Sequence, residues 1–363
     1  MSLNLAVIGG DGIGPEVTAA ALRVLDAAAD PANLAYQTTD FPFSAGHYLD
    51  TGHVLDEADI AELGRFDAIV LGAVGGKPNA PRLAGGVIEK GILLRLRFEL
   101  DQYINLRPVK LYPGIDTPLK DRGPDDIDFI CVRENTEDLY CGLGGIMRKH
   151  TPHEVANQTM VATRFGVDRC LRYAFELART RPRNKLTLVH KTNVLTYAGD
   201  TWHRAFAEMA EQYSDVATNY HHVDACCMYM VSDPSQYDVI VVPNMFGDII
   251  TDLGAAIAGG MGIAASGNLN PNGAAPGMFE PVHGSAPDIA GQHIANPIAA
   301  IDSMGLLLRE TGRIKGDQAA VKAGQLIGDA VQAVTPNFAG KRLDRSGYST
   351  DQVATLVIDA LNG

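Results

Sequence analysis

The 363-residue chain has few basic residues for its acidic content: 30 Lys and Arg stand against 43 Asp and Glu, which gives a formal net charge of −13. Proteins that bind nucleic acid regardless of its sequence need Lys and Arg to displace the counterions of the phosphates. The excess of acid therefore argues against a nucleic-acid partner, and it disfavours an anionic lipid surface for the same reason.

The sequence also lacks long apolar runs. It has no stretch of about 18 apolar residues, so no membrane-spanning helix is expected. Its first residues contain no basic segment followed by an apolar one, so no export signal is expected either.

Cysteine is scarce, and its spacing is uninformative for metal binding. The five cysteines are odd in number and form no C-x-x-C pair. This pattern predicts reduced thiols and favours neither a disulfide framework nor a zinc ribbon. We therefore expect a globular protein of the cytoplasm.

What the sequence does contain is the alternation typical of an α/β protein. Its length corresponds to roughly two domains, and a hydrophobic content of 46% excludes a disordered chain. A helix is predicted from Pro15 to about Ala29, and two glycine-rich stretches, 72–86 and 267–277, are predicted to be loops. Strands are predicted at residues 3–8, 67–71, 128–132, 186–189 and 238–242. Because these runs are nearly continuous in apolar residues, we expect strands buried on both faces and mainly parallel pairing.

Polar residues cluster directly after four of these predicted strands, at 9–14, 133–137, 190–193 and 244–252. In open α/β sheets ligands bind beyond the carboxyl ends of the strands, so the four clusters predict one shared cleft. The first cluster is a glycine loop of the form G-x-G-x-G-P. It departs from the G-x-G-x-x-G dinucleotide fingerprint and is equally compatible with a tight strand-to-helix turn.

Two aspartates in the last cluster have the spacing of metal ligands. Asp248 and Asp252 are four residues apart, so on a helix their carboxylates project from one face about 5–6 Å apart. Hard oxygen ligands of this kind suit Mg²⁺ or Mn²⁺. The alternative, that Asp248 only caps a helix, leaves Asp252 unexplained inside an apolar run. Asp224 is a candidate third carboxylate or, taken alone, a surface residue.

Three arginines and two further side chains are candidates for substrate chemistry. Arg97, Arg107 and Arg133 have apolar neighbours, and a guanidinium group matches a carboxylate bidentately. If the three converge they describe a substrate with more than one carboxylate, whereas each alone is typical of a surface salt bridge. Lys191 directly follows a predicted buried strand and is a candidate base, and Tyr140 is a candidate proton donor.

Taken together, these motifs resemble the β-decarboxylating dehydrogenase family, which includes enzymes for 3-isopropylmalate, isocitrate, homoisocitrate, tartrate and D-malate. The resemblance extends over almost the whole chain and keeps the family's order. It is carried by G-D-G-I-G-P-E, L-R-x-x-x-x-x-x-x-N-L-R-P, V-R-E-N-T-E, H-K-T-N-V-L, N-x-F-G-D-I-I-T-D-L and E-P-V-H-G-S-A-P-D-I-A-G.

The resemblance implies an isopropylmalate dehydrogenase-like two-domain α/β fold with a mainly parallel sheet, distinct from a Rossmann fold. A discontinuous NAD-binding domain would comprise residues 1–104 and 262–363. Residues 105–261 would form the substrate and dimerisation domain, with a swapped arm at about 140–155. An obligate homodimer with a shared active site is implied as well.

The resemblance also assigns roles residue by residue. Tyr140 and Lys191 would be the acid–base pair, and Lys191 would act in the partner's site. The substrate would contact Leu93, Leu94, Arg97, Arg107 and Arg133. Mg²⁺ or Mn²⁺ would be held by Asp248 and Asp252 together with Asp224 of the other subunit. NAD would contact Ile13, Asn193, Glu280, His283, Gly284, Ser285, Ala286, Asp288 and Asn296. An acidic residue in such a loop can bond a ribose 2′-hydroxyl and so favour NAD over NADP.

The implied reaction is metal- and NAD-dependent oxidative decarboxylation of a 3-substituted malate. Ile92, Leu93 and Leu94 offer an apolar surface one turn before Arg97, which favours 3-isopropylmalate and a role in leucine biosynthesis. By contrast, Asn135 and Asp138 depart from the leucine-pathway pattern. Asn135 favours a tartrate, D-malate or homoisocitrate enzyme.

Two other classes are less favoured. A metal-free Rossmann oxidoreductase would not need the paired Asp248 and Asp252. A non-catalytic homologue would typically lose catalytic groups, and here Lys191, Tyr140 and all three aspartates are present.

Overall fold

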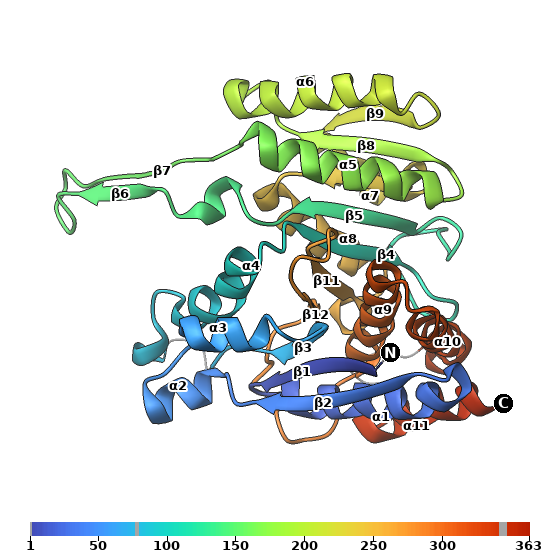
Figure 1. Cartoon of the computed structure of the whole chain (residues 1–363). Coiled ribbons are helices and arrows are strands. Elements are labelled where there is room, and N and C mark those ends of the chain that lie inside the picture. The colour runs from blue at the N-terminus through green and yellow to red at the C-terminus, as the bar shows by residue number, and fades with distance from the viewer. Residues whose placement is uncertain (1, 77–79, 341–346) are drawn as a thin grey trace.

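The computed structural model describes residues 2–76, 80–340 and 347–363, and its main feature is one ten-stranded sheet (Figure 1). In spatial order the strands are β2 (Ala35–Phe41), β1 (Ser2–Gly10), β3 (Ala68–Ala73), β12 (Gly277–Pro281), β11 (Ala265–Leu269), β4 (Ile104–Lys110), β5 (Asp128–Glu134), β10 (Val239–Val242), β8 (Lys185–His190) and β9 (Ala217–His222).

Most neighbouring strands are parallel, as predicted. Antiparallel pairing is confined to the centre, where β11 lies between β12 and β4, and β4 pairs with β5. The five predicted strands are all present, because each is a buried apolar run. The strands that were not predicted include β2 and β9, which lie at the two edges and are polar; β2 is largely exposed and β9 is partly exposed.

One predicted loop is shorter than expected, because only residues 270–276 of the stretch 267–277 lie outside strands. Part of the stretch 267–277 belongs to the buried strand β11, which ends at Leu269. Gly267 is needed there because a Cβ atom would lie 2.8 Å from a ring carbon of Phe279. Of the other predicted loop, 72–86, residues 77–79 lie outside the described residues, while its first two residues complete β3 and Pro81–Leu83 form a short 3₁₀ turn.

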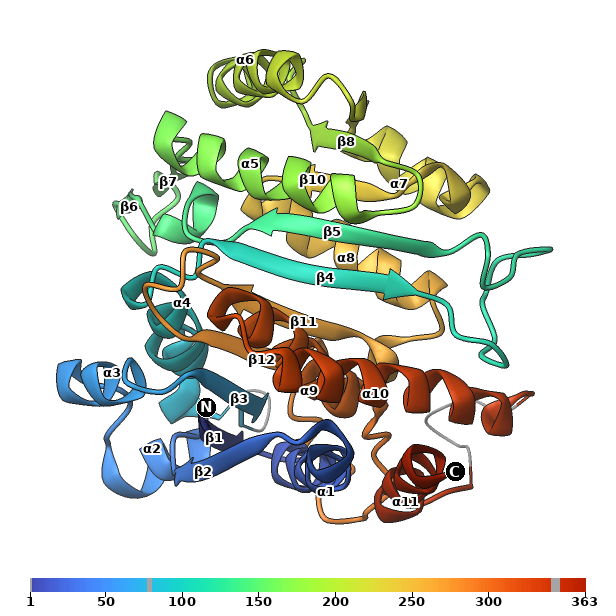
Figure 2. The same cartoon turned by 45° about the vertical axis from the view of Figure 1, so that its right-hand side comes forward.

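Helices cover both faces of the sheet. They are α1 (Gly14–Ala32), α2 (Ala45–Thr51), α3 (Glu57–Leu63), α4 (Arg95–Glu99), α5 (Arg164–Thr180), α6 (Thr196–Gln212), α7 (Val223–Ser232), α8 (Asn244–Ile257), α9 (Ile298–Lys315), α10 (Gln318–Val334) and α11 (Thr350–Asn362). The predicted first helix is confirmed with Pro15 in its first turn. In Figure 2, α5 lies in front of β5 and β10, whereas α7 and α8 lie behind them.

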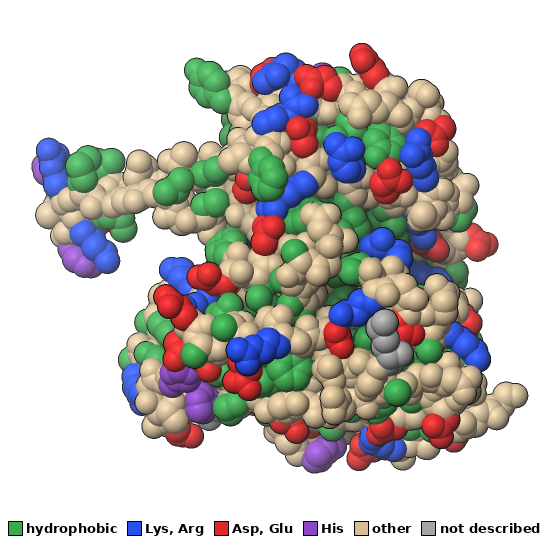
Figure 3. Space-filling view, in the orientation of Figure 1, with side chains coloured by type: hydrophobic (Ala, Val, Ile, Leu, Met, Phe, Trp, Pro, Cys, Tyr) green, Lys and Arg blue, Asp and Glu red, His purple; other side chains and the backbone are tan. Residues whose placement is uncertain are grey.

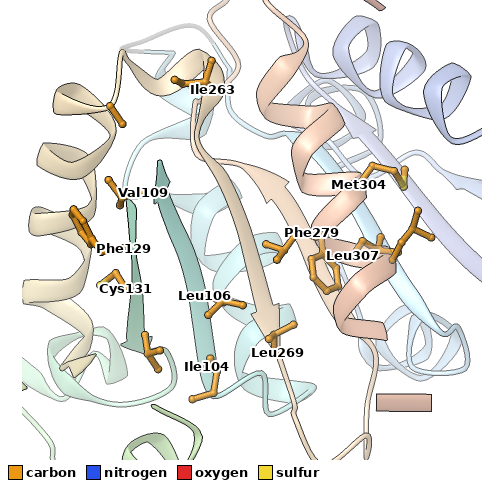
Figure 4. Close-up of a cluster of buried hydrophobic side chains, with 14 of the residues drawn as sticks. Ile104, Leu106, Val109, Phe129, Cys131, Ile263, Leu269, Phe279, Met304 and Leu307 are labelled. Carbon is orange, nitrogen blue, oxygen red and sulfur yellow. The ribbon is translucent and has the colours of Figure 1, made fainter. Parts of the chain in front are cut away.

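The two ends of the chain build one half of the sheet, from β2 to β11, and the middle of the chain builds the other half, from β4 to β9. The halves meet where β11 pairs with β4, with Gly267 opposite Leu106. Buried side chains such as Leu106, Leu269 and Phe279 continue the apolar core across this seam (Figure 4). We propose that the two domains meet at this pair of strands.

A two-stranded arm projects from the body of the molecule. Its strands β6 (Gly144–Met147) and β7 (Val155–Gln158) are antiparallel and exposed along their whole length (Figures 1 and 3). A single hairpin has little stability of its own in water. The arm nevertheless carries exposed apolar side chains, among them Leu143, Ile146 and Met147. Elsewhere, no helix among the described residues has the length and apolar character needed to cross a bilayer.

Candidate active site

The structure brings the three candidate arginines together at the middle of the sheet. Arg97 lies on α4, Arg107 on β4 and Arg133 near the end of β5, and their exposed fractions are 4%, 7% and 1%. Helix α8 faces this group with its two aspartates. Arg133 Nη1 lies 2.5 Å from Asp248 Oδ1, and Arg107 Nη2 lies 3.6 Å from the same oxygen. Asp252 Oδ1 lies 3.8 Å from Arg107 Nη1.

Burial of three neighbouring cations has an electrostatic cost. Desolvation, together with repulsion from the other arginines, lowers the pKa of Arg107 to about 10, and burial also lowers the pKa of Arg97. Each arginine keeps one buried nitrogen without a hydrogen-bond partner among the described residues: Arg97 Nε, Arg107 Nε and Arg133 Nη2. Because buried unpaired donors are costly, the cluster is suited to a ligand with more than one negative charge.

The position of α8 explains the local sequence. The helix begins at Asn244 after Pro243, so Asp248 lies inside it and the capping alternative is wrong. Gly247 lets Arg133 pass beside the helix, because a Cβ atom there would lie 2.5 Å from Arg133 Cγ. Although burial raises the pKa of Asp248, the attraction of Arg133 and Arg107 outweighs it and the net shift is downward.

Sequence reasoning missed two residues of α8 that hold the arginines. Asn244 Oδ1 accepts a 2.9 Å bond from Arg133 Nε, and Thr251 Oγ1 accepts a 2.6 Å bond from Arg107 Nη1. These residues lie four before and three after Asp248, so helical periodicity would place all three on one face.

Tyr140 joins the same cluster from η3 (Asp138–Cys141), the 3₁₀ turn at the base of the arm. Its hydroxyl donates a 2.9 Å hydrogen bond to Asp248 Oδ2, and the Arg133 guanidinium lies 5.2 Å from the centre of its ring. Burial raises the pKa of Tyr140. The phenol therefore keeps its proton at neutral pH and is able to donate it.

Lys191 and Asp224 lie apart from this cluster. Lys191 follows β8, and its Nζ donates a 2.7 Å hydrogen bond to Asp224 Oδ1 at the start of α7, which lowers the pKa of Asp224. The Asp224 side chain is 66% exposed. The predicted acid–base pair is thus divided, since Tyr140 is bonded to Asp248 and Lys191 to Asp224.

The three predicted metal ligands do not assemble within one chain either. Over the described ranges, the only three His, Cys, Asp or Glu side chains close enough to share a metal are His53, Asp56 and Asp59. Asp56 and Asp59 form the capping box of α3, so they already have a structural task.

The predicted nucleotide-binding residues lie mainly in the loop after β12. The glycine turn lies directly against this loop, because Ile13 N donates a 2.9 Å hydrogen bond to Ser285 O. Gly12 has a φ of +61°, and a Cβ atom there would lie 1.9 Å from the same oxygen. His283 Nε2 is buried without a partner among the described residues. Gly284, Asp288 and the more distant Asn193 are exposed.

Comparison with known proteins decides the family. The sequence model described as "Isocitrate/isopropylmalate dehydrogenase" matches residues 4–355. The chain belongs to this family.

Curated relatives of this dehydrogenase cover nearly its full length. It is 52% identical to the 3-isopropylmalate dehydrogenase of Clavibacter sepedonicus, over 99% of this chain and 98% of the relative. It is 54% identical to that of Clavibacter michiganensis subsp. michiganensis, over 91% and 97%. The solved isocitrate dehydrogenase from Methylococcus capsulatus is 31% identical and superimposes with a TM-score of 0.86, covering 99% of this chain and all of that one.

The leucines before Arg97 have different environments in this dehydrogenase. They lie on η2, a π-helical turn covering Glu89–Leu94 directly before α4. Ile92 is completely buried in the core, and Leu93 packs against that core. Leu94 is only partly buried and contacts neither core cluster among the described residues. Of the three, it is the side chain best placed to meet a substrate.

Asn135 belongs to a buried series of hydrogen-bonded side-chain amides and lies outside the arginine cluster. It is 1% exposed, and its Nδ2 donates to Gln102 O at 2.8 Å and to Asn268 Oδ1 at 3.0 Å. Asn268 in turn donates a 3.0 Å bond to Glu280 Oε1, which also accepts a 3.1 Å bond from Arg97 Nη2. Asn268 and the contact between Glu280 and Arg97 had no signal in the sequence, because three distant segments meet here.

Proposed function

We propose that this protein is a 3-isopropylmalate dehydrogenase of leucine biosynthesis. It would convert 3-isopropylmalate to 4-methyl-2-oxopentanoate, with NAD as oxidant and Mg²⁺ or Mn²⁺ as metal. The observation that carries the proposal is the group of three buried arginines with unpaired nitrogens beside the two acidic residues of α8. The curated relatives that bear this name support the choice of substrate.

The residues present fit a divalent cation. The Asp252 side chain is 62% exposed and, within the described part of the chain, makes only a long contact with Arg107, so its carboxylate oxygens are available. Three arginines face Asp248, Asp252 and Glu280, and the charges of a divalent cation and a dicarboxylate would cancel one another within that group. When bound, the cation would lower the pKa of the substrate hydroxyl and stabilise the negative charge left by decarboxylation.

The chain's own side chains would do the remaining work. Arg97, Arg107 and Arg133 would bind and orient the two carboxylates of the malate. Lys191 would remove the proton of the 2-hydroxyl during oxidation, directly or through a water molecule. Tyr140 would donate its proton to the carbon that has lost carbon dioxide. Leu94 would contact the isopropyl group.

The nucleotide site is proposed at the loop after β12. The unpaired, buried His283 Nε2 offers a polar contact, and the exposed Gly284 leaves room for a ligand to approach the backbone. NAD bound there would accept the hydride from the substrate. The remaining predicted contacts are Ile13, Asn193, Glu280, Ser285, Ala286, Asp288 and Asn296.

We further propose a homodimer in which Lys191 and Asp224 complete the partner's site. Most exposed large hydrophobic side chains of the described residues lie on the arm, in the segment that follows Lys191, on α7 and on α8. They are Leu143, Ile146, Met147, Val155, Val194, Tyr197, Met228, Tyr229, Val231, Met245 and Ile249. Apolar surface of this extent is typical of a protein interface. The five free cysteines are consistent with the cytoplasm as the compartment.

The test is NADH production by the purified protein with Mn²⁺ or Mg²⁺. We would compare 3-isopropylmalate, D-malate, tartrate, isocitrate and homoisocitrate, and repeat the best reaction with NADP. The proposal predicts the highest kcat/KM with 3-isopropylmalate and NAD. Preference for D-malate or tartrate would keep the chemistry and change the substrate, whereas no turnover of any compound would refute the proposed function.

A further inference from the structure

Asp138 lies at the base of the arm in an unfavourable conformation. Its φ is +71°, in the left-handed region that glycine adopts most easily. Its side chain is nevertheless buried, with an exposed fraction of 2%, and burial raises its pKa. A strained backbone and a buried carboxyl group both need compensating contacts.

Those contacts join three parts of the molecule. The backbone N–H of Asp138 donates to Val161 O at 2.9 Å, and Asp138 O accepts from Val161 N at 3.4 Å, which closes the two ends of the arm. The side chain accepts a 2.7 Å bond from Leu139 N on one oxygen and a 2.7 Å bond from Met245 N on the other. Asp138 therefore connects the arm, η3 and the first turn of α8.

Helix α8 needs this connection at its N-terminus. The residue before the helix is Pro243, which provides no side-chain cap, so the first N–H groups of the helix lack a local acceptor. The Asp138 carboxyl group, remote in sequence, accepts the N–H of Met245 instead. A second bond runs from Asn244 Nδ2 to Glu137 O at 3.2 Å. The turn before Tyr140 is thus bonded twice to the start of α8.

Tyr140 follows Asp138 by two residues, and its hydroxyl bonds Asp248 one helical turn beyond Met245. We infer that Asp138 is a positioning residue, which holds η3 against α8 so that the Tyr140 hydroxyl stays on Asp248. The inference rests on the proposed function, because it gives Asp138 a task in a reaction that Tyr140 carries out. Misplacement of a catalytic group by about 1 Å can cost on the order of 100-fold in rate.

The test uses two substitutions and a matched control. Asp138→Gly removes the side-chain acceptor and relieves the strained φ. Asp138→Asn keeps one acceptor oxygen, which can serve Met245 N, and loses the second acceptor at Leu139 N, at a position that asparagine tolerates. Asp121→Gly is the control, because Asp121 also has a positive φ, +56°, but is exposed in the loop between β4 and β5.

The first readout is amide hydrogen exchange, which needs no substrate. We expect Asp138→Gly to exchange faster than the native protein in residues 139–142 and in the first turn of α8, and Asp121→Gly to match the native protein in both segments. Unchanged exchange in Asp138→Gly would overturn the inference. Hydrogen exchange tests the positioning role of Asp138 even if none of the five candidate substrates is turned over. That lack of turnover would refute the proposed function without refuting the inference about Asp138.

The second readout separates positioning from mere stabilisation. For 3-isopropylmalate we expect Asp138→Gly to lower kcat by about tenfold or more with a smaller change in KM, and Asp138→Asn to stay within about threefold of the native kcat. In a Tyr140→Phe background Asp138→Gly should have little further effect on kcat, because coupled residues are not additive. A lower Tm with native kcat at 25 °C would show a purely structural role and overturn the inference.

Discussion

The proposed active site has two parts of opposite character within one chain. The arginine cluster is buried and tied to α8 by Asn244, Asp248 and Thr251. In the pair formed by Lys191 and Asp224, the side chains are 24% and 66% exposed, and a single hydrogen bond joins them. A buried ionic cluster is strongly held but rigid, whereas an exposed pair contributes little to stability and is easily redirected. The difference fits the proposed homodimer, in which Lys191 and Asp224 would act in the partner's site.

The largest effect is expected from one substitution in each part of the site, followed by co-expression of the two variants. Lys191→Met and Asp248→Asn should each lower kcat by about 10³-fold or more, because they remove a proton-transfer group and a metal ligand. Co-expression of the two variants should restore about a quarter of the native activity, since half of the dimers are mixed and each contains one intact site.

The control for this experiment is Lys185→Met, at the opposite end of β8, which should retain native activity. If the co-expressed variants remain as inactive as either variant alone, although mixed dimers form, the site is not shared between subunits.

A smaller effect is expected at the rim of the buried part. Leu94→Ala should lower kcat/KM for 3-isopropylmalate by about 10–200-fold and change that for D-malate little, because a lost apolar contact costs about 1–3 kcal/mol. Leu93→Ala is the matched control, since Leu93 packs against the core. Leu93→Ala should lower Tm more and specificity less. Equal losses with both substrates in Leu94→Ala would contradict the contact with the isopropyl group.

The buried Glu134, which accepts hydrogen bonds from Thr136 and from the backbone N–H of Glu137, should affect the pH dependence of stability. Burial raises the pKa of Glu134 from its ordinary value of 4.5 to about 7. Between these values the folded protein keeps a proton that the unfolded chain has lost, so the free energy of unfolding falls as pH rises. The fall attributable to this group is at most roughly 3 kcal/mol. Glu134→Gln should flatten this part of a urea-unfolding pH series, and an unchanged slope would exclude Glu134 as its source.

The smallest effect is expected from Asn135→Leu. The substitution removes two buried hydrogen bonds and leaves Gln102 O without that donor. We expect a loss of about 1–3 kcal/mol in the free energy of unfolding. The order of preference among the five candidate substrates should not change, because Asn135 lies in the buried series of side-chain amides. A switch toward or away from 3-isopropylmalate would show that this position controls specificity after all.

The sequence alone predicted the architecture because local sequence patterns determine where strands and helices form. Continuous apolar runs such as 186–189 predict buried parallel strands, and the four-residue spacing of Asp248 and Asp252 predicts their common helical face. Strands β2 and β9 were not predicted because they are polar edge strands. Strand β11 was not predicted because the glycines required for packing beside Phe279 are typical of a loop.

For the site, the motifs indicated which residues matter, whereas only the tertiary structure decided how they are grouped. Asn135 and Asp138 looked like signals of substrate choice, yet their partners Asn268 and Met245 are more than a hundred residues away. The same holds for the division between the arginine cluster and the Lys191–Asp224 pair. Periodicity and spacing report interactions within a few residues, but hydrogen bonds between distant segments depend on how strands and helices pack, and no local pattern encodes that.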